Sequence, residues 1–278
     1  MQFQHLQAVV FDWAGTVIDF GSQAPMGAFV ELFARHGVAI SIEEARVPMG
    51  LPKWEHIQSL GQQPRIAAAW QQAKGAPFTD DDVDALYAEF TPMNMASVQH
   101  HARLIGGTSE LVQMLRERGL RIGSTTGYNR EIMQVLAPLA AAQGFVPDNL
   151  VCAGDLPRSR PSPMGMLQTF KDLGVTQAEA SVKVDDTVPG LLEGRNAGCW
   201  TVAVMASGNA LGLTEAQWRA MDEPAREVAR EQARQSLGDA QPDFWIDSIT
   251  SLLPVLRDID LRLDLGQHPS GAQLAEAR

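Results

Sequence analysis

Short apolar runs that alternate with helical segments constrain the fold of this chain more than any other feature. The runs lie at 6–11, 119–125, 149–153, 181–185 and 199–205, and helical periodicity marks 108–118, 130–142, 163–173 and 187–197. Continuous apolar runs of this length are typical of strands buried on both faces, and their alternation with helices indicates βαβ units. The sequence therefore predicts an α/β fold with a doubly wound, Rossmann-like parallel sheet.

The segment between the first two runs breaks this alternation, because it contains helical patterns and no convincing strand. The helical patterns lie at 24–37, 41–46, 53–60, 64–74 and 80–98. Ser41 with Glu44 forms a capping-box pattern, and Thr79 precedes an acidic first turn. We therefore expect an all-helical cap that is inserted after the first strand.

The expected domain organisation has three parts: an α/β core at 1–20 and 101–265, a helical cap domain at 21–100, and a flexible tail at 266–278. A hinge near Phe20–Ser22 and a returning strand around 99–106 would connect the cap to the core. Later in the core, we expect a helical region at 213–237 that is interrupted near Pro224, and then an edge strand at 243–247.

The charge balance excludes one large class of partners. The chain carries 22 Lys and Arg residues against 33 Asp and Glu residues, which gives a net charge of −11. No spare positive charge exists to neutralise a phosphate backbone, so we expect no nucleic-acid partner, and an anionic ligand must be captured by local cations. The N-terminus lacks a basic segment with a cleavage site, and its apolar run is too short to span a membrane. We therefore expect a cytoplasmic protein with no membrane partner.

Polar side chains follow the predicted strands where each strand ends. Asp12 follows the first strand, Thr126 the second and Arg160 the loop after the third, while Asp185 and Asp186 end the fourth. Taken singly, each residue has an ordinary role as a helix cap, a turn residue or a surface charge. Because ligands bind beyond the carboxyl ends of parallel strands, we expect these positions to converge at one edge of the sheet. A carboxylate nucleophile, an acidic pair for a divalent metal and a guanidinium suit phosphoryl transfer.

These positions resemble the four motifs of the haloacid dehalogenase superfamily, which here are DWAGT at Asp12–Thr16, Thr126, Arg160 and Asp186. From about residue 5 to 260 the chain resembles the phosphonatase family more narrowly, through PMGLPKWEH at 48–56, GSTTGYN at 123–129 and EGRNAG at 193–198. Ala14 together with Lys53 is specific to the phosphonatase type. The resemblance implies hydrolysis of the P–C bond of phosphonoacetaldehyde to acetaldehyde and phosphate, in the degradation of 2-aminoethylphosphonate.

Ala14 and Lys53 also have a chemical meaning of their own. Phosphatases of the superfamily typically carry a general acid at the position of Ala14, and alanine cannot transfer a proton. A carbanion is too basic to leave phosphorus, but an imine between Lys53 and the adjacent aldehyde makes the leaving group a neutral enamine. Lys53 must be neutral to attack the aldehyde, and a helix N-terminus, a metal ion and a desolvating cap all lower its pKa.

The resemblance implies a role for each remaining candidate residue. Asp12 attacks phosphorus and forms an aspartyl phosphate, while His56 and Met49 assist proton transfer around the imine. Mg²⁺ is held by Asp12, the backbone carbonyl of Ala14, and Asp186. The phosphonate substrate is bound by Thr126, Gly127, Tyr128, Arg160 and Gly50.

The chain departs from the family pattern after the fourth strand. Many family members have a Gly-Asp pair followed by a further Asp four residues later, whereas this chain has Asp185 and Asp186 followed by Gly190. We therefore assign metal ligation only to Asp186. Whether Asp185 compensates for Gly190 around the metal stays open at the level of sequence.

The sequence leaves two alternative functions open, and the resemblance also implies an oligomeric state. A phosphomonoesterase of the same superfamily shares everything except Ala14 and Lys53, and it would cleave sugar phosphates. A phospho-receiver signalling domain also uses an acidic pair, an Asp, a Thr and a Lys, but the chain order and the large cap argue against it. The resemblance implies a homodimer through the cap, where Trp54 and Trp70 supply apolar contacts or, more simply, pack in the core.

Overall fold

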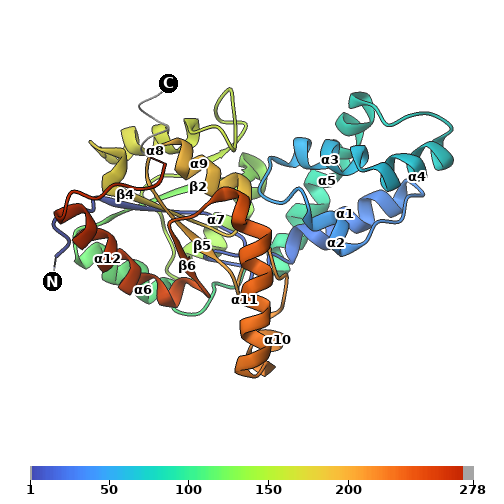
Figure 1. The fold of residues 1–278 in the computed structure, drawn as a ribbon. Helices are drawn as coiled ribbons and strands as arrows, with labels where there is room; N and C mark the ends of the chain where they lie inside the picture. The colour runs from blue at the N-terminus through green and yellow to red at the C-terminus, as the bar shows by residue number, and fades with distance from the viewer. Residues whose placement is uncertain (1, 272–278) are drawn as a thin grey trace.

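The computed structural model describes residues 2–271 and contains one sheet of six parallel strands in the order β3-β2-β1-β4-β5-β6 (Figure 1). The strands are β1 (Ala8–Phe11), β2 (Arg121–Asn129), β3 (Val151–Ala153), β4 (Ser181–Asp185), β5 (Trp200–Val204) and β6 (Phe244–Ile246). The chain adds β2 and β3 on one side of β1, and β4, β5 and β6 on the other, which is a doubly wound topology. The predicted α/β fold class is confirmed.

Helices cover both faces of the sheet, and for this reason every residue of β1, β4 and β5 is buried. Val9 and Phe11 of β1 pack in one apolar cluster, whereas Val10 packs in another on the opposite face. The first cluster includes residues of α6 (Thr108–Glu117), α7 (Arg130–Ala141) and α12 (Leu252–Asp264). The opposite face is covered by α8 (Met164–Leu173) and α9 (Val188–Asn196).

Five of the six helices between β1 and β2 form the inserted cap, which lies to one side of the sheet in Figure 1. They are α1 (Ala24–Arg35), α2 (Ile42–Arg46), α3 (Lys53–Gln62), α4 (Pro64–Lys74) and α5 (Asp80–His100). The capping box predicted at Ser41 is present, and the helix start predicted at Thr79 is also held by a capping box, with Asp82. The cap has an apolar core of its own that contains Phe29, Phe90 and the buried Trp70, so Trp70 packs inside the cap.

Two short linkers join the cap to the core. The strand predicted around 99–106 is wrong, because α5 continues to His100 and the chain beyond it forms only an isolated bridge between Leu104 and Ile18. Backbone hydrogen bonds from Asp19 N to Arg103 O (3.0 Å) and from Ile105 N to Val17 O (2.9 Å) hold the two linkers side by side. The pairing is too short to form a strand. In the outgoing linker, Gly21 and Ser22 both have positive φ angles, of 82° and 52°.

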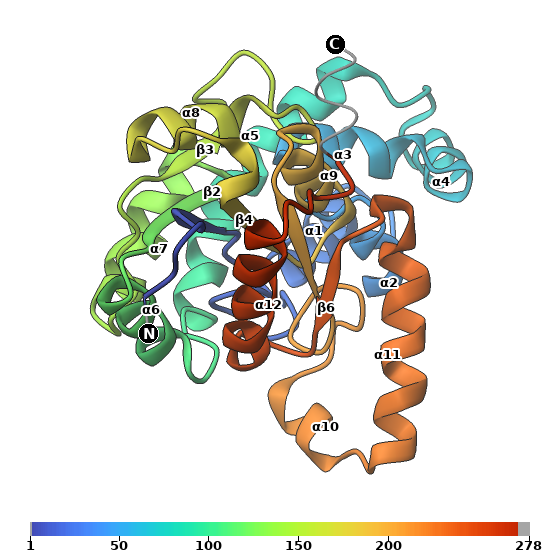
Figure 2. The same cartoon turned by 60° about the vertical axis from the view of Figure 1, so that its left-hand side comes forward.

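The C-terminal part of the chain contains two helices where one interrupted helical region was predicted. The helical region breaks as expected before Pro224, into α10 (Glu215–Ala220) and α11 (Glu223–Leu237), which project away from the sheet (Figures 1 and 2). Three short 3-10 helices complete the described secondary structure, at Ala178–Ala180, Gly238–Ala240 and Ile249–Ser251.

The expected flexible tail begins after α12. Within residues 266–271, His268 Nδ1 lies 2.6 Å from Glu179 Oε2, and Ser270 N donates to Asp243 Oδ1 at 2.9 Å, so this part contacts the core. The rest of that prediction, 272–278, lies outside the described residues. Between residues 2 and 271, no helix is both long enough and apolar enough to cross a membrane.

Candidate active site

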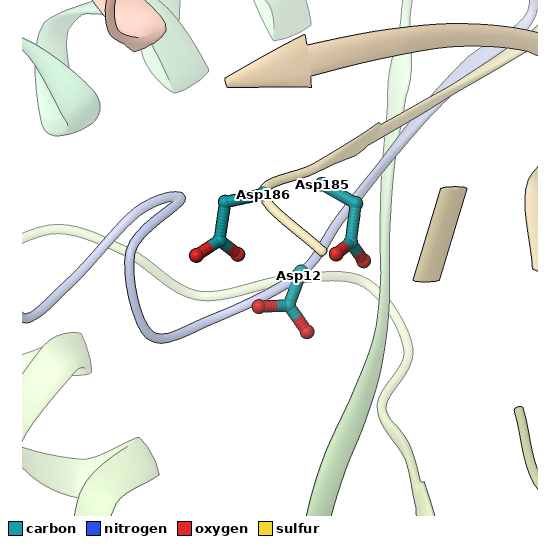
Figure 3. Close-up of side chains that lie close together, drawn as sticks. All are labelled: Asp12, Asp185 and Asp186. Atoms are coloured by element: carbon teal, nitrogen blue, oxygen red, sulfur yellow. The ribbon is translucent and has the colours of Figure 1, made fainter. Parts of the chain in front are cut away.

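Three carboxylates meet where β1 and β4 end (Figure 3). Asp12 follows β1, Asp185 ends β4 and Asp186 comes next, and one oxygen of each lies within 4.8 Å of one oxygen of the others. The two strands are neighbours in the sheet, with Phe11 paired to Val184, so their carboxyl ends coincide. All three carboxylates are buried, and Asp185 and Asp186 are fully so.

The turn after β1 presses against Asp186. Asp186 Oδ1 accepts a hydrogen bond from Thr16 Oγ1 (3.2 Å), and its Oδ2 accepts one from Asn209 N (2.7 Å). Gly15 has a φ of 82°, and a Cβ on this residue would lie closer than 3.0 Å to the Asp186 carboxylate. Only glycine combines that backbone conformation with so close an approach.

Arg160 connects the nucleophile candidate to a buried network of charges. Its guanidinium lies 2.8 Å from Asp12 Oδ1 and 3.4 Å from Asp185 Oδ2, and it donates to Glu193 Oε2 (3.1 Å) and to Thr125 O (2.7 Å). Burial alone would lower the pKa of Arg160, but the carboxylates of Asp185, Asp12 and Glu193 raise it above its usual value. Arg160 is therefore a fixed cation beside Asp12.

Lys183 and Glu193 are part of this network and are absent from the sequence-based site. Lys183 Nζ lies 3.2 Å from Asp185 Oδ2 and 3.3 Å from Glu193 Oε2, and it donates a hydrogen bond to Thr125 Oγ1. Both side chains are almost completely buried. The position of Lys183 inside an apolar strand could have revealed this network from the sequence, because a buried charge requires a partner.

Lys53 approaches the same site from the cap. It is the first residue of α3 after Pro52, and its side chain is only 5% exposed. Its Nζ lies 5.1 Å from the centre of the Tyr128 ring, and it donates a hydrogen bond to Met49 Sδ at 3.8 Å. Burial lowers the pKa of Lys53 from 10.5 to about 8, although Asp12 opposes the shift. A substantial fraction of the amine is thus neutral near physiological pH.

His56 lies one turn along α3, but behind the pocket. Its Nε2 is 2.9 Å from Ala45 O, and its ring stacks on Phe29 with centroids 3.9 Å apart. Burial lowers the pKa of His56 well below its usual value, and the Lys53 charge acts in the same direction. His56 thus contacts Phe29, and the Phe29 ring centre is 5.8 Å from Lys53 Nζ.

The candidate residues from cap and core line one small cavity of about 20 Å³, which has room for about one water molecule. Its lining contains nine of the predicted residues, namely Asp12, Ala14, Met49, Gly50, Lys53, Thr126, Gly127, Tyr128 and Arg160. Ser22 and Thr187 also line it and were missed by sequence analysis. Thr126 Oγ1 accepts a hydrogen bond from Tyr128 N at 3.1 Å, which fixes this loop. Residues of the cap and of the core thus line this cavity together.

Comparison with known proteins agrees with this geometry. A family model described as haloacid dehalogenase-like hydrolase matches residues 6–198. Two relatives named phosphonoacetaldehyde hydrolase are each 47% identical to the chain. The one from Paraburkholderia xenovorans is matched over 96% of this chain and 100% of its own length, and the one from Vibrio parahaemolyticus over 95% and 98%. The chain belongs to the phosphonoacetaldehyde hydrolase family.

Comparison with solved structures indicates the same family, and it shows that more distant proteins share the fold. A phosphonoacetaldehyde hydrolase-like protein from Oleispira antarctica is 39% identical, covers 97% of this chain and 98% of its own, and superposes with a TM-score of 0.94. A β-phosphoglucomutase from Clostridium difficile, 16% identical with a TM-score of 0.67, shares the fold alone. The resemblance to phosphonatases is thus confirmed, and this member of the phosphonoacetaldehyde hydrolase family is a hydrolase.

Hydrolases of this superfamily generally use a divalent metal, and the phosphonoacetaldehyde hydrolase site described above fits a hard cation. Its carboxylate oxygens are the ligands that such a cation prefers. Burial raises the pKa of Asp12 to about 6, and burial together with Asp12 and Asp185 raises that of Asp186 well above its usual value. A bound cation would remove this repulsion between buried carboxylates.

Proposed function

We propose that this chain hydrolyses the P–C bond of phosphonoacetaldehyde to acetaldehyde and phosphate through an imine on Lys53. The observation that supports this proposal most is the position of Lys53, a buried amine that lines the same cavity as Asp12 and Arg160. Ala14 lines this cavity where the phosphatases of the superfamily carry an acid. The names of the closely similar relatives support the same substrate.

In the first step, neutral Lys53 attacks the aldehyde carbon to give a carbinolamine. The carbinolamine takes up one proton from solvent and loses water, which leaves a protonated imine on Lys53. The lowered pKa supplies the neutral amine, and the nearby rings of Tyr128 and Phe29 favour the cationic imine that follows. Met49, in contact with Lys53 Nζ, helps to hold the amine in place.

In the second step, Asp12 attacks phosphorus in line with the P–C bond. The P–C electron pair moves into the protonated imine and gives a neutral enamine, while Asp12 becomes an aspartyl phosphate. Arg160, already 2.8 Å from Asp12, faces the phosphoryl oxygens, and Thr126 and Gly127 complete the binding of that group. Gly50 and Tyr128 enclose the aldehyde end of the substrate.

In the last steps, the enamine carbon takes a proton and water hydrolyses the resulting imine, which releases acetaldehyde and restores the Lys53 amine. Water also hydrolyses the aspartyl phosphate to give phosphate and Asp12. His56 is not among the residues that line the cavity, and its ring stacks on Phe29, so we place it as a support for the amine.

Mg²⁺ is the metal that we propose for this site. Asp12, Asp186 and the backbone carbonyl of Ala14 would hold it, and it would offset the negative charge of the phosphonate next to these carboxylates. We further propose a cytoplasmic enzyme of 2-aminoethylphosphonate degradation that forms a homodimer through the cap. Since Trp70 is buried inside the cap, the partly buried Trp54 is the tryptophan left for that contact. Light scattering tests the dimer.

Reductive trapping tests the proposed reaction. The protein is incubated with phosphonoacetaldehyde and Mg²⁺, reduced with borohydride and mapped by peptide mass spectrometry. We expect an ethyl group on Lys53 when P–C cleavage precedes reduction, or a phosphonoethyl group when it does not. The Lys53→Arg variant should give neither the adduct nor acetaldehyde.

The other three lysines provide an internal control, because Lys74, Lys171 and Lys183 occupy other parts of the same chain. Lys183 is as buried as Lys53 but is held in ion pairs. An adduct on any of these three lysines would contradict the assignment of the amine. Absence of an adduct with efficient phosphate release from phosphate monoesters would make the chain a phosphomonoesterase.

A further inference from the structure

An outer cleft between cap and core adjoins the candidate active site. It has a volume of about 570 Å³, and Lys53 lines both this outer cleft and the small cavity beside Asp12. On the cap side, the start of α3 and Tyr87 of α5 line the cleft, and on the core side most of its lining belongs to segment 153–162. A cleft of this size admits a small organic molecule next to the proposed amine.

A connecting cavity of about 20 Å³ links the outer cleft to the groups proposed to bind the phosphoryl oxygens. Thr126, Gly127 and Arg160 line both this connecting cavity and the small cavity beside Asp12. Arg158 lines both the connecting cavity and the outer cleft. The three spaces therefore follow one another, from the outer cleft past Arg158 to Arg160, whose guanidinium lies 2.8 Å from Asp12 Oδ1.

The guanidinium of Arg158 has donors to spare. Arg158 is exposed, and among residues 2–271 its side chain forms neither an ion pair nor a hydrogen bond. The nearest acidic residue in sequence, Asp155, is already paired with Arg130. Arg160, two residues later, is buried and held in ion pairs. In this loop, Arg158 is therefore the arginine that can bind an incoming anion.

The charge of the outer cleft differs from that of the whole chain. The charged residues that line it are Lys53, Glu55 and Arg158, so cations exceed anions by one when Lys53 is protonated, although the net charge of the chain is −11. Leu156 and Pro157 add apolar surface beside Arg158. A free cation between apolar walls focuses the electric field, so the outer cleft attracts anions that the rest of the chain repels.

We propose that Arg158 captures the anionic phosphonate group of the substrate in the outer cleft and directs it to Arg160. Two arginines then act on the same group in succession, Arg158 at the entrance and Arg160 beside Asp12. This inference rests on the proposed function, and it adds the residue that determines how readily an anionic substrate is taken up. Inorganic phosphate carries the same kind of charged group and provides a probe that does not react.

The test compares the natural chain with Arg158→Ala and Arg158→Lys in the steady-state hydrolysis of phosphonoacetaldehyde with Mg²⁺. Arg158→Ala should raise KM by about 3- to 10-fold at low ionic strength, because one exposed charge that attracts the substrate is lost. Since this charge acts on uptake and not on the chemical step, kcat should stay within about twofold. At about 1 M salt the Debye length is only about 3 Å, so the difference in KM should nearly disappear. Arg158→Lys keeps the charge and should restore most of the loss.

Arg257→Ala is the matched control. Arg257 is also exposed and has no ion pair within residues 2–271, but it belongs to α12, which lies away from the cap in Figure 1. Its loss changes the net charge of the chain by the same amount as the loss of Arg158. We therefore expect an unchanged KM for Arg257→Ala at low and at high ionic strength.

An unchanged KM in Arg158→Ala at low ionic strength would overturn the proposal. A rise of equal size at both ionic strengths would also overturn it, because such a rise indicates altered packing, and so would the same rise in Arg257→Ala, which indicates an effect of net charge alone.

Binding of inorganic phosphate to the protein in the presence of Mg²⁺, measured by calorimetry, gives a second readout that needs no P–C cleavage. Arg158→Ala should weaken phosphate binding at low ionic strength by a factor similar to the rise in KM. If trapping on Lys53 fails while Arg158→Ala still weakens phosphate binding, only the proposed substrate is rejected. If trapping on Lys53 succeeds while KM and phosphate affinity are unchanged in Arg158→Ala, only the capture role of Arg158 is rejected.

Discussion

The burial of Lys53 determines the pH range over which its amine is neutral. Because burial lowers its pKa from 10.5 to about 8, the protonated form dominates below pH 8 and the neutral form above it. We expect the rate of imine formation to rise with pH and to level off above about pH 8. Borohydride trapping with acetaldehyde measures this rate without the ionisation of a phosphonate. A rate that is still rising at pH 10 would show an ordinary lysine.

Glu193 offers a second prediction at this scale. Its carboxylate accepts hydrogen bonds from Arg160 Nε and Thr125 Oγ1, and it lies 3.3 Å from Lys183 Nζ. Glu193→Ala leaves two buried cations short of a partner, so we expect a loss of about 3–5 kcal/mol in the free energy of unfolding. Urea unfolding measures it, and Glu227→Ala, which removes an exposed carboxylate of α11, should change stability by less than about 0.5 kcal/mol. Equal losses of unfolding free energy in the two variants would contradict the role of Glu193 as the partner of the buried cations.

The site residues that the sequence predicts are those whose position follows from topology. Asp12 and Asp186 end neighbouring parallel strands, so alternation of strands and helices is enough to bring them together. Glu193 and Thr125 are different, because they meet Arg160 from 33 and 35 residues away and no local pattern marks such a pairing. Their buried charges and hydroxyls become informative only once the fold is known.

At the scale of elements, local patterns predicted most helices and missed one. Thr79 and Ser41 mark helix starts through hydrogen bonds within four residues, so both helix starts could be recognised from sequence. Helix α12 was not predicted, although its buried residues Leu252, Leu256 and Ile259 have helical spacing. The returning strand was predicted wrongly, since the pairing of Leu104 with Ile18 depends on where the cap leaves the core.

The loop before α3 gives a prediction for an element. Gly50 has a φ of 93°, and a Cβ there would lie closer than 3.0 Å to Thr187 of the core. Gly50→Ala should therefore push the cap loop off the core and raise the KM for phosphonoacetaldehyde. Gly75, which ends α4 with a φ of 76° and has nothing near its added Cβ, is the matched control. Both changes cost about 1–2 kcal/mol of backbone strain, so only the contact with Thr187 distinguishes the two variants. An equal rise of KM in both variants would contradict the importance of the contact between Gly50 and Thr187.

For the whole molecule, the central fact is that neither domain holds a complete site. The cap supplies Lys53 and Met49, and the core supplies Asp12, Thr126 and Arg160, around a cavity of about 20 Å³. In the proposed mechanism, the substrate would enter with the cap displaced and react with the cap closed over the core. In the same mechanism, closure would also keep water from the imine until the P–C bond is broken.

Arg46 is the contact that couples closure to the carboxylate site. From the end of α2 its guanidinium donates to Gly21 O and to Asn209 Oδ1, both at 2.9 Å, and the backbone N of Asn209 donates to Asp186 Oδ2. One cap side chain thus contacts both the outgoing linker and the loop that holds a metal-ligand candidate. Hydrogen bonds from a charged donor contribute about 1.5–3 kcal/mol each, so their loss should open the cap measurably.

We expect Arg46→Ala to raise the KM for phosphonoacetaldehyde by about tenfold or more, the equivalent of about 1.4 kcal/mol lost from the closed state. Amides of the two linkers, at 17–22 and 101–105, should exchange faster in hydrogen-exchange mass spectrometry, because both linkers must move when the cap opens. Arg65→Ala is the control, since Arg65 bonds only Glu44 and Ala39 O within the cap. If Arg65→Ala accelerates linker exchange as much as Arg46→Ala, the effect is general loosening of the cap. Faster exchange with Arg46→Ala alone makes this arginine the link between cap closure and the order of Asp186.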